Sequence, residues 1–110
     1  PFPDNTFDIV VCFDTIEHAK DPWSLIASAA RVMKPGGYLF LAAPFSFPIH
    51  GYPDDYWRFT PRGLQLLIEE AGLEVFGDVT KTKDVAIEPD AEHWFANPSE
   101  VKTLARKPLA

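Results

Sequence analysis

The chain has 110 residues, of which 46% are hydrophobic and 14% aromatic, and it carries a formal net charge of −6. This length allows one domain at most, and the composition is sufficient to bury a core. The acidic balance argues against a nucleic-acid partner, and no apolar run approaches the ~20 residues that span a bilayer. Cys12 is the only cysteine, so no internal disulfide can form, which fits a reducing, cytoplasmic setting.

The first predicted strand is the continuous apolar run within Phe7–Phe13. A run this short and this rich in β-branched residues is typical of a strand buried on both faces, as in a parallel sheet covered by helices. Cys12 is expected to serve there as a small buried hydrophobe. Because ligands of open α/β sheets bind beyond the carboxyl ends of the strands, the polar stretch Asp14–His18 is the first candidate site.

A helix is predicted from Pro22 to Met33, because Asp21 followed by proline is typical of a helix start. The Pro-Gly-Gly sequence at 35–37 is expected to end this helix. Tyr38–Ala43 is a second apolar run and predicts a second buried strand. Strand, helix and strand together predict a right-handed βαβ unit whose strands are parallel.

A long irregular loop is predicted from Phe45 to Thr60, rich in aromatic and charged residues. It leaves the carboxyl end of the second strand, on the same side as Asp14–His18, and loops of this length are often functional. Thr60-Pro61 then begins a second helix, which Gly72 ends. The shared placement of the two loops is a second argument for a site at this edge.

The remaining third of the sequence has a weaker pattern. Leu73–Thr80 alternates and predicts a third strand, and Lys81–Pro98 is interpreted as a loop with a possible helical turn at Ala91–Phe95. Glu100–Arg106 predicts a last strand, in which the residues that face one way are Val101, Thr103 and Ala105.

Three stretches together resemble a known family. They are DNTFDIVVCFDTIEH at 4–18, the helix end KPGG at 34–37, and HGYPDDYWRFTPRGL at 50–64. They resemble the second half of class I S-adenosylmethionine-dependent methyltransferases, in particular the methyltransferase type 11-like domain, over about 3–79. The resemblance implies an α/β fold with a partial Rossmann-like sheet and flanking helices. Its strands would be four to seven of the family, in the order four, five, seven, six, with the seventh antiparallel.

The family's cofactor is held mainly by a glycine-rich turn after its first strand and by an acidic residue after its second. This sequence has six glycines and no GxGxG turn. Residues 1–110 are therefore expected to form the carboxyl-terminal half of a methyltransferase domain, inactive as an isolated fragment. The strand within Asp8–Phe13 would then expose an unpaired edge, which predicts a longer protein or a homodimer through that edge.

The activity that the resemblance implies is methyl transfer from S-adenosylmethionine to a small-molecule acceptor. His18 and Glu17 are the predicted catalytic residues. The predicted cofactor-binding residues are Asp14, Thr15 and Ile16. The predicted substrate-binding residues are His50, Tyr52, Asp55, Tyr56 and Arg58. The histidines lack metal-ligand spacing, so no metal is expected.

Simpler interpretations stay open beside these. Glu17 and His18 could merely bond backbone groups at the loop-to-helix junction, and Arg58 could pair with Asp54 or Asp55. Packing on the following helix is the favoured interpretation for two aromatic residues, Trp57 and Phe59. For the whole chain, the alternatives are a non-catalytic remnant or interaction module, and another Rossmann-like domain such as a dehydrogenase.

Overall fold

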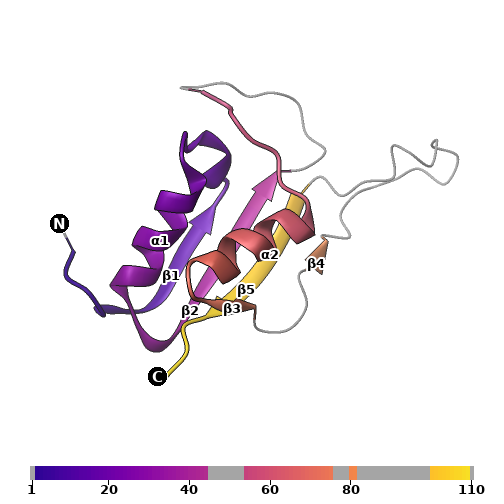
Figure 1. The fold of residues 1–110 in the computed structure, drawn as a ribbon. Coiled ribbons are helices and arrows are strands. Elements are labelled where there is room, and N and C mark those ends of the chain that lie inside the picture. Colours follow the sequence, from indigo (N-terminus) through magenta and orange to yellow (C-terminus); the bar gives the residue numbers. More distant parts are fainter. Residues whose placement is uncertain (1, 45–53, 76–79, 82–99, 110) are drawn as a thin grey trace, which may run out of the picture.

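The computed structural model describes residues 2–44, 54–75, 80–81 and 100–109 (Figure 1). Its longer elements are β1 (Phe7–Phe13), α1 (Pro22–Val32), β2 (Met33–Pro44), α2 (Pro61–Glu70) and β5 (Glu100–Arg106). Its short elements are the 3-10 helix η1 (Ile16–His18) and the two-residue strands β3 (Glu74–Val75) and β4 (Thr80–Lys81). No described helix is long and apolar enough to cross a membrane.

The strands form one mixed sheet in the order β1-β2-β5-β3, and β4 also pairs with β5. β1 and β2 are parallel, whereas β5 runs antiparallel to β2, β3 and β4. The α/β class and the predicted strand order, including the antiparallel last strand, are confirmed. The third predicted strand is present at its ends as β3 and β4, while 76–79 and the predicted turn at 91–95 lie outside the described residues.

Both helices begin where the sequence predicts. The Asp21 carboxylate accepts a hydrogen bond from the Ser24 amide at 3.2 Å, and the Thr60 hydroxyl accepts one from the Gly63 amide at 3.0 Å. Each of these residues satisfies an amide that the first helical turn leaves without a partner, and each is followed by a proline at the first helical position.

The end of α1 differs slightly from the prediction. The helix ends at Val32 and β2 begins at once with Met33, five residues before the predicted start at Tyr38. Pro35 disfavours helical dihedrals at the residue before it, so the chain is extended here. Gly37 lies so close to β1 that a Cβ atom would stand 3.0 Å from the Asp8 carbonyl oxygen. The Pro-Gly-Gly turn therefore also lets β2 pair with β1.

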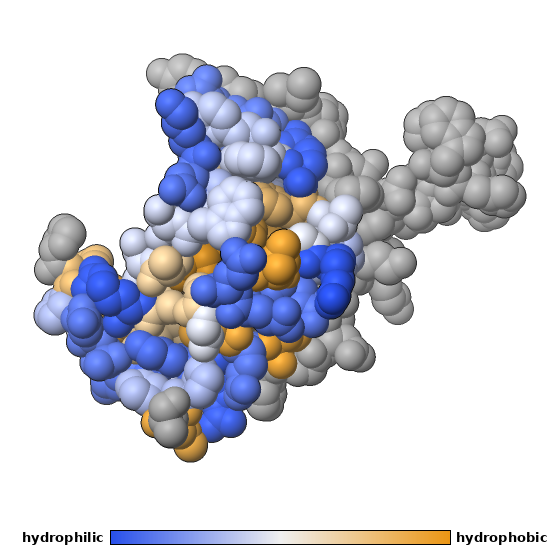
Figure 2. All heavy atoms as spheres, viewed as in Figure 1, coloured by the Kyte–Doolittle hydropathy of each residue, from blue (hydrophilic) through white to orange (hydrophobic). Residues whose placement is uncertain are grey.

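The core lies between one face of the sheet and the two helices, which stand in front of the sheet in Figure 1. Its fully buried members include Ile26, Leu39, Leu41, Leu64, Ile68, Val101 and Ala105. Figure 2 shows that the helix-bearing side is largely hydrophilic and that hydrophobic atoms are visible mainly between the helices. Both helices thus turn their apolar faces to the sheet.

On the opposite face of the sheet, β1 is exposed to solvent in the part of the chain that the structure describes, which corrects one prediction. β1 was expected to be buried on both faces, yet Ile9, Val11 and Phe13 are 58%, 57% and 51% exposed. Phe40, the neighbour of Val11 on β2, is 39% exposed on the same face. The described helices cover only the face that carries Val10 and Cys12, so alternate residues of β1 remain in contact with solvent.

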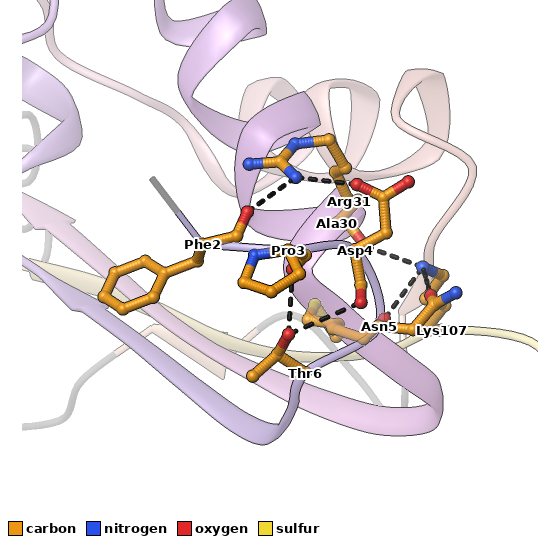
Figure 3. A network of polar contacts seen from close by, with 9 residues as sticks. Phe2, Pro3, Asp4, Asn5, Thr6, Ala30, Arg31 and Lys107 are labelled. Atoms are coloured by element: carbon orange, nitrogen blue, oxygen red, sulfur yellow. Dashed lines mark hydrogen bonds and ion pairs between the residues drawn. The ribbon is translucent and has the colours of Figure 1, made fainter.

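Figure 3 shows how polar contacts fasten the amino-terminal segment to the end of α1. Arg31 donates hydrogen bonds to the Phe2 carbonyl at 2.9 Å and to the Asp4 carboxylate at 2.7 Å. The Lys107 ammonium donates to the Asn5 side chain at 2.9 Å and to the carbonyls of Ala30 and Met33, each at 2.8 Å. These contacts hold the segment before β1, the end of α1 and the end of β5 together.

Candidate functional site

The candidate site begins at the carboxyl end of β1, where the backbone turns sharply into η1. Asp14 has φ of +52°, a conformation that aspartate tolerates better than most residues. Its amide still donates to the Ala42 carbonyl at 2.9 Å, so the turn begins directly at the strand end. The Thr15 hydroxyl donates to the Phe13 carbonyl at 3.0 Å. Asp14 and Thr15 are exposed, whereas Ile16 is fully buried and anchors the turn in the core.

Glu17 is buried although it carries a carboxylate, and its side chain has no exposed surface. Its backbone carbonyl accepts hydrogen bonds from the amides of Tyr56 at 2.8 Å and Trp57 at 3.2 Å. These bonds bring the segment before α2 against the loop after β1. The sequence prediction that the two loops meet at one edge of the sheet is thereby confirmed for this part.

His18 lies between an oxygen of each loop. Its Nδ1 atom is 2.5 Å from the carbonyl oxygen of Asp54, and its Nε2 atom is 3.5 Å from the Glu17 carboxylate. A carbonyl oxygen can only accept a hydrogen bond, so Nδ1 must carry a proton. Nε2 is therefore the ring nitrogen that faces the Glu17 carboxylate.

Arg58 and Asp55 bind each other in a two-point ion pair. One guanidinium nitrogen lies 2.5 Å from Asp55 Oδ1 and the other lies 2.8 Å from Oδ2. The Asp55 side chain is only 2% exposed, and Arg58 also donates to the Trp57 carbonyl at 2.9 Å. Hydrogen bonding to Asp55 raises the pKa of Arg58, and the charge of Glu17 adds to this effect. The simpler interpretation, an internal ion pair, thus describes Arg58 in this structure.

Aromatic side chains surround these polar groups. Trp57 makes an edge-to-face contact with Trp23, with ring centroids 6.0 Å apart, and stacks on Phe59 at 6.3 Å. Phe59 is buried in the core, as the packing interpretation expects. Tyr56 is 47% exposed and donates its hydroxyl proton to the Asp54 carboxylate at 3.2 Å, which raises the pKa of Tyr56.

The structure thus brings together Asp14 to His18 and Asp55, Tyr56 and Arg58. Two predicted substrate-binding residues, His50 and Tyr52, lie outside the described residues. Sequence reasoning missed the Asp54 carbonyl as the partner of His18. Every residue has a backbone carbonyl, so the residue type at position 54 cannot predict this contact. Within the described ranges, no cluster of three or more His, Cys, Asp or Glu side chains could hold a metal ion.

Comparison with known proteins supports the resemblance. Residues 1–41 match the family model described as "Methyltransferase domain". The chain has a class I methyltransferase-like fold. It is 29% identical over 118 aligned residues to the ubiquinone biosynthesis O-methyltransferase of Thiobacillus denitrificans, covering 86% of this chain and 51% of that protein. The 110 residues of this methyltransferase-like chain therefore span about half the length of that relative.

A second relative is an uncharacterized methyltransferase of Schizosaccharomyces pombe, 41% identical over 56 residues, 51% of this chain and 20% of that protein. Among solved structures, one similar chain comes from a Haloferax volcanii complex between a methyltransferase and an activator protein. Its TM-score is 0.72 at 21% identity, over 98% of this chain and 57% of that one. The structure of a methyltransferase of Aquifex aeolicus matches with a TM-score of 0.66 at 22% identity. This match covers 96% of this chain and 48% of that one. These structures establish the fold alone.

Proposed function

We propose that the chain forms the carboxyl-terminal half of a methyltransferase domain that transfers a methyl group from S-adenosylmethionine to a small-molecule acceptor. One observation carries this proposal. His18 stands beyond the carboxyl end of β1, in a methyltransferase-like sheet, with Nδ1 held by a carbonyl and Nε2 beside a buried carboxylate. This is the place and the arrangement expected of a group that accepts a proton at an α/β ligand crevice.

The described residues fit one end of the cofactor. Asp14 and Thr15 are exposed at the turn after β1, where a carboxylate can face the positive sulfonium. Ile16 would support them from the core, since its side chain is fully buried. The ribose and adenine would be held by the other half of the domain, because these 110 residues contain no GxGxG turn.

When bound, S-adenosylmethionine supplies a methyl group on a sulfonium, which leaves as a neutral thioether. The residues of this chain would hold the acceptor in line with the methyl–sulfur bond and would receive the acceptor's proton. Nε2 of His18 would receive the proton of the acceptor's hydroxyl group, and Glu17 would stabilise the resulting imidazolium. Orientation by the aromatic side chains of Trp23, Tyr56 and Trp57 would contribute most of the rate.

The exposed apolar residues on the second face of β1 support the half-domain part of the proposal. Val11 and Phe40 are neighbours in the register of β1 and β2, and with Phe13 they form an exposed apolar group that another polypeptide could cover. A complementing half that adds a strand beside β1 and helices on this face would cover both the edge and the surface. The relative from Thiobacillus denitrificans has the length for such a half, because this chain covers 51% of it.

The alternative is a non-catalytic interaction module that forms a homodimer through the Asp8–Phe13 edge. β1 is an end strand of the described sheet, so it can pair with a second copy. Edge-to-edge pairing extends the sheet but leaves its apolar face in contact with solvent. A complementing half explains both features, whereas this dimer explains only one.

The test is a transfer assay with radiolabelled S-adenosylmethionine and a panel of small-molecule acceptors that carry a hydroxyl group. The chain is mixed with the amino-terminal half of the Thiobacillus denitrificans relative. We expect transfer only in the mixture, and a loss of about 10² to 10⁴-fold in His18→Gln. A matched control is Arg31→Gln, far from the site, which should keep full activity. A mixture that assembles and binds cofactor but transfers no methyl group would refute the proposal, as would an unaffected His18→Gln.

A further inference from the structure

Asp55 and Arg58 bind each other immediately beside the residue that contacts His18. We propose that the Asp55–Arg58 ion pair is a positioning device that fixes the Nδ1–H tautomer of His18. It does so by holding the Asp54 carbonyl against the imidazole ring. The inference deepens the proposed function and rests on it for its catalytic meaning, since this tautomer leaves Nε2 to accept a proton.

The first step concerns the two acceptors beside the ring. A proton on Nδ1 points to the Asp54 carbonyl at 2.5 Å, and a proton on Nε2 would point to the Glu17 carboxylate at 3.5 Å. Hydrogen bonds to a carboxylate are inherently the stronger of the two. The neutral ring keeps its proton on Nδ1 because the Asp54 carbonyl oxygen, at 2.5 Å, lies closer to the ring than the Glu17 carboxylate, at 3.5 Å. The tautomer thus depends on what fixes Asp54.

The second step identifies what fixes Asp54. The Asp54 carbonyl belongs to the peptide bond with Asp55. The Asp55 carboxylate is buried and accepts hydrogen bonds from two nitrogens of Arg58. On the other side of Asp55, the amides of Tyr56 and Trp57 donate to the Glu17 carbonyl. The peptide between Asp54 and Asp55 is therefore held from the side chain and from the following backbone.

The third step separates positioning from substrate binding. Both oxygens of Asp55 contact the guanidinium of Arg58, which directs its Nη1 and Nη2 atoms toward that carboxylate. In the described part of the chain, the charged and titratable groups near His18 include Glu17 on its own element and Asp54, Asp55, Tyr56 and Arg58 on the facing segment. Loss of Arg58 would leave Asp55 charged and buried, so this segment would move outward to hydrate it.

The test is long-range proton–nitrogen correlation NMR of the ¹⁵N-labelled chain at a pH where His18 is neutral. The chain has three histidines, and the His18 signals are those missing from His18→Gln. We expect only the Nδ1–H tautomer in the wild type and mainly Nε2–H in a folded Arg58→Gln. The matched control Arg31→Gln removes another Arg–Asp pair, with Asp4 at 2.7 Å, and should leave His18 unchanged.

An Nε2–H ring in the wild type would overturn the inference, and so would a folded Arg58→Gln that keeps Nδ1–H. If Arg58→Gln does not fold, Arg58→Lys replaces it, because lysine keeps the charge but loses the two-point geometry. It should then show detectable Nε2–H, and an unchanged tautomer would refute the proposal. Because the readout needs no catalysis, an intact tautomer response without methyl transfer would refute only the proposed function.

Discussion

Lys107 is predicted to be a main support of the fold, although it lies at the end of β5. Its backbone pairs with Gly36 and Gly37, through Gly36 N–H to its carbonyl at 2.8 Å and its own N–H to Gly37 at 2.9 Å. Its position is thus fixed, and its ammonium donates three hydrogen bonds, two of them to carbonyls near the end of α1 (Figure 3). Lys107→Met keeps the aliphatic stem and removes only the charge and the donors.

The expected cost follows from these contacts. A hydrogen bond that involves a charged group contributes about 1.5–3 kcal/mol, and a cation at a helix carboxyl end adds roughly 0.3–1 kcal/mol. The three bonds share one ammonium, which is dehydrated once, and water can reach part of this half-buried site. We therefore expect a net loss of roughly 2–3 kcal/mol. For a chain of this size, this corresponds to a fall in Tm on the order of 10 °C.

Thermal and urea unfolding followed by circular dichroism would measure this loss. The control is Lys34→Met, because Lys34 is 49% exposed and lies 3.8 Å from an Asp8 carboxylate that is itself 80% exposed. Its removal should change stability by less than about 0.5 kcal/mol. If Lys107→Met were as stable as Lys34→Met, the contacts at the end of α1 would contribute nothing and the reasoning would be refuted.

Three further predictions concern ionisable groups. Hydrogen bonds from Ser24 lower the pKa of Asp21, so its stabilisation is present above its ordinary value of 3.8 and is lost as pH falls below it. The Tm difference between wild type and Asp21→Asn should shrink from pH 6 to pH 2, and a constant difference would contradict this. Burial raises the pKa of the Cys12 thiol, so iodoacetamide should label it more slowly in the folded than in the urea-unfolded chain, and equal rates would contradict this. The hydrogen bond to Asp54 raises the pKa of Tyr56, so Asp54→Asn should lower it in an ultraviolet titration, and an unchanged titration would argue against that bond.

The elements of the fold were predictable because local signals and tertiary packing agree. Asp21-Pro22 and Thr60-Pro61 mark helix starts by the chemistry of the first turn alone. The alternation of Val101, Thr103 and Ala105 likewise predicted the inner face of β5, and all three are buried. The strand order came from the resemblance, because pairing partners distant in sequence leave no local pattern.

What the sequence could not predict depends on contacts between distant segments. The apolar run of β1 predicts burial on both faces, whereas the described residues cover only one of them, and residue type alone does not reveal this difference. Arg58 has the chemistry to bind an anionic substrate as well as Asp55, and only the distances select the internal pair. The partner of His18 is a backbone carbonyl, which any residue at position 54 would provide.

The central claim is that these 110 residues form half of an S-adenosylmethionine site. Isothermal titration of S-adenosylmethionine tests it most directly, first into the chain alone and then into its mixture with the amino-terminal half of the Thiobacillus denitrificans relative. The mass in solution is recorded for both samples. The account predicts micromolar binding by an assembled mixture and none by the chain alone. An assembled mixture without binding, or equal binding by the chain alone, would contradict it.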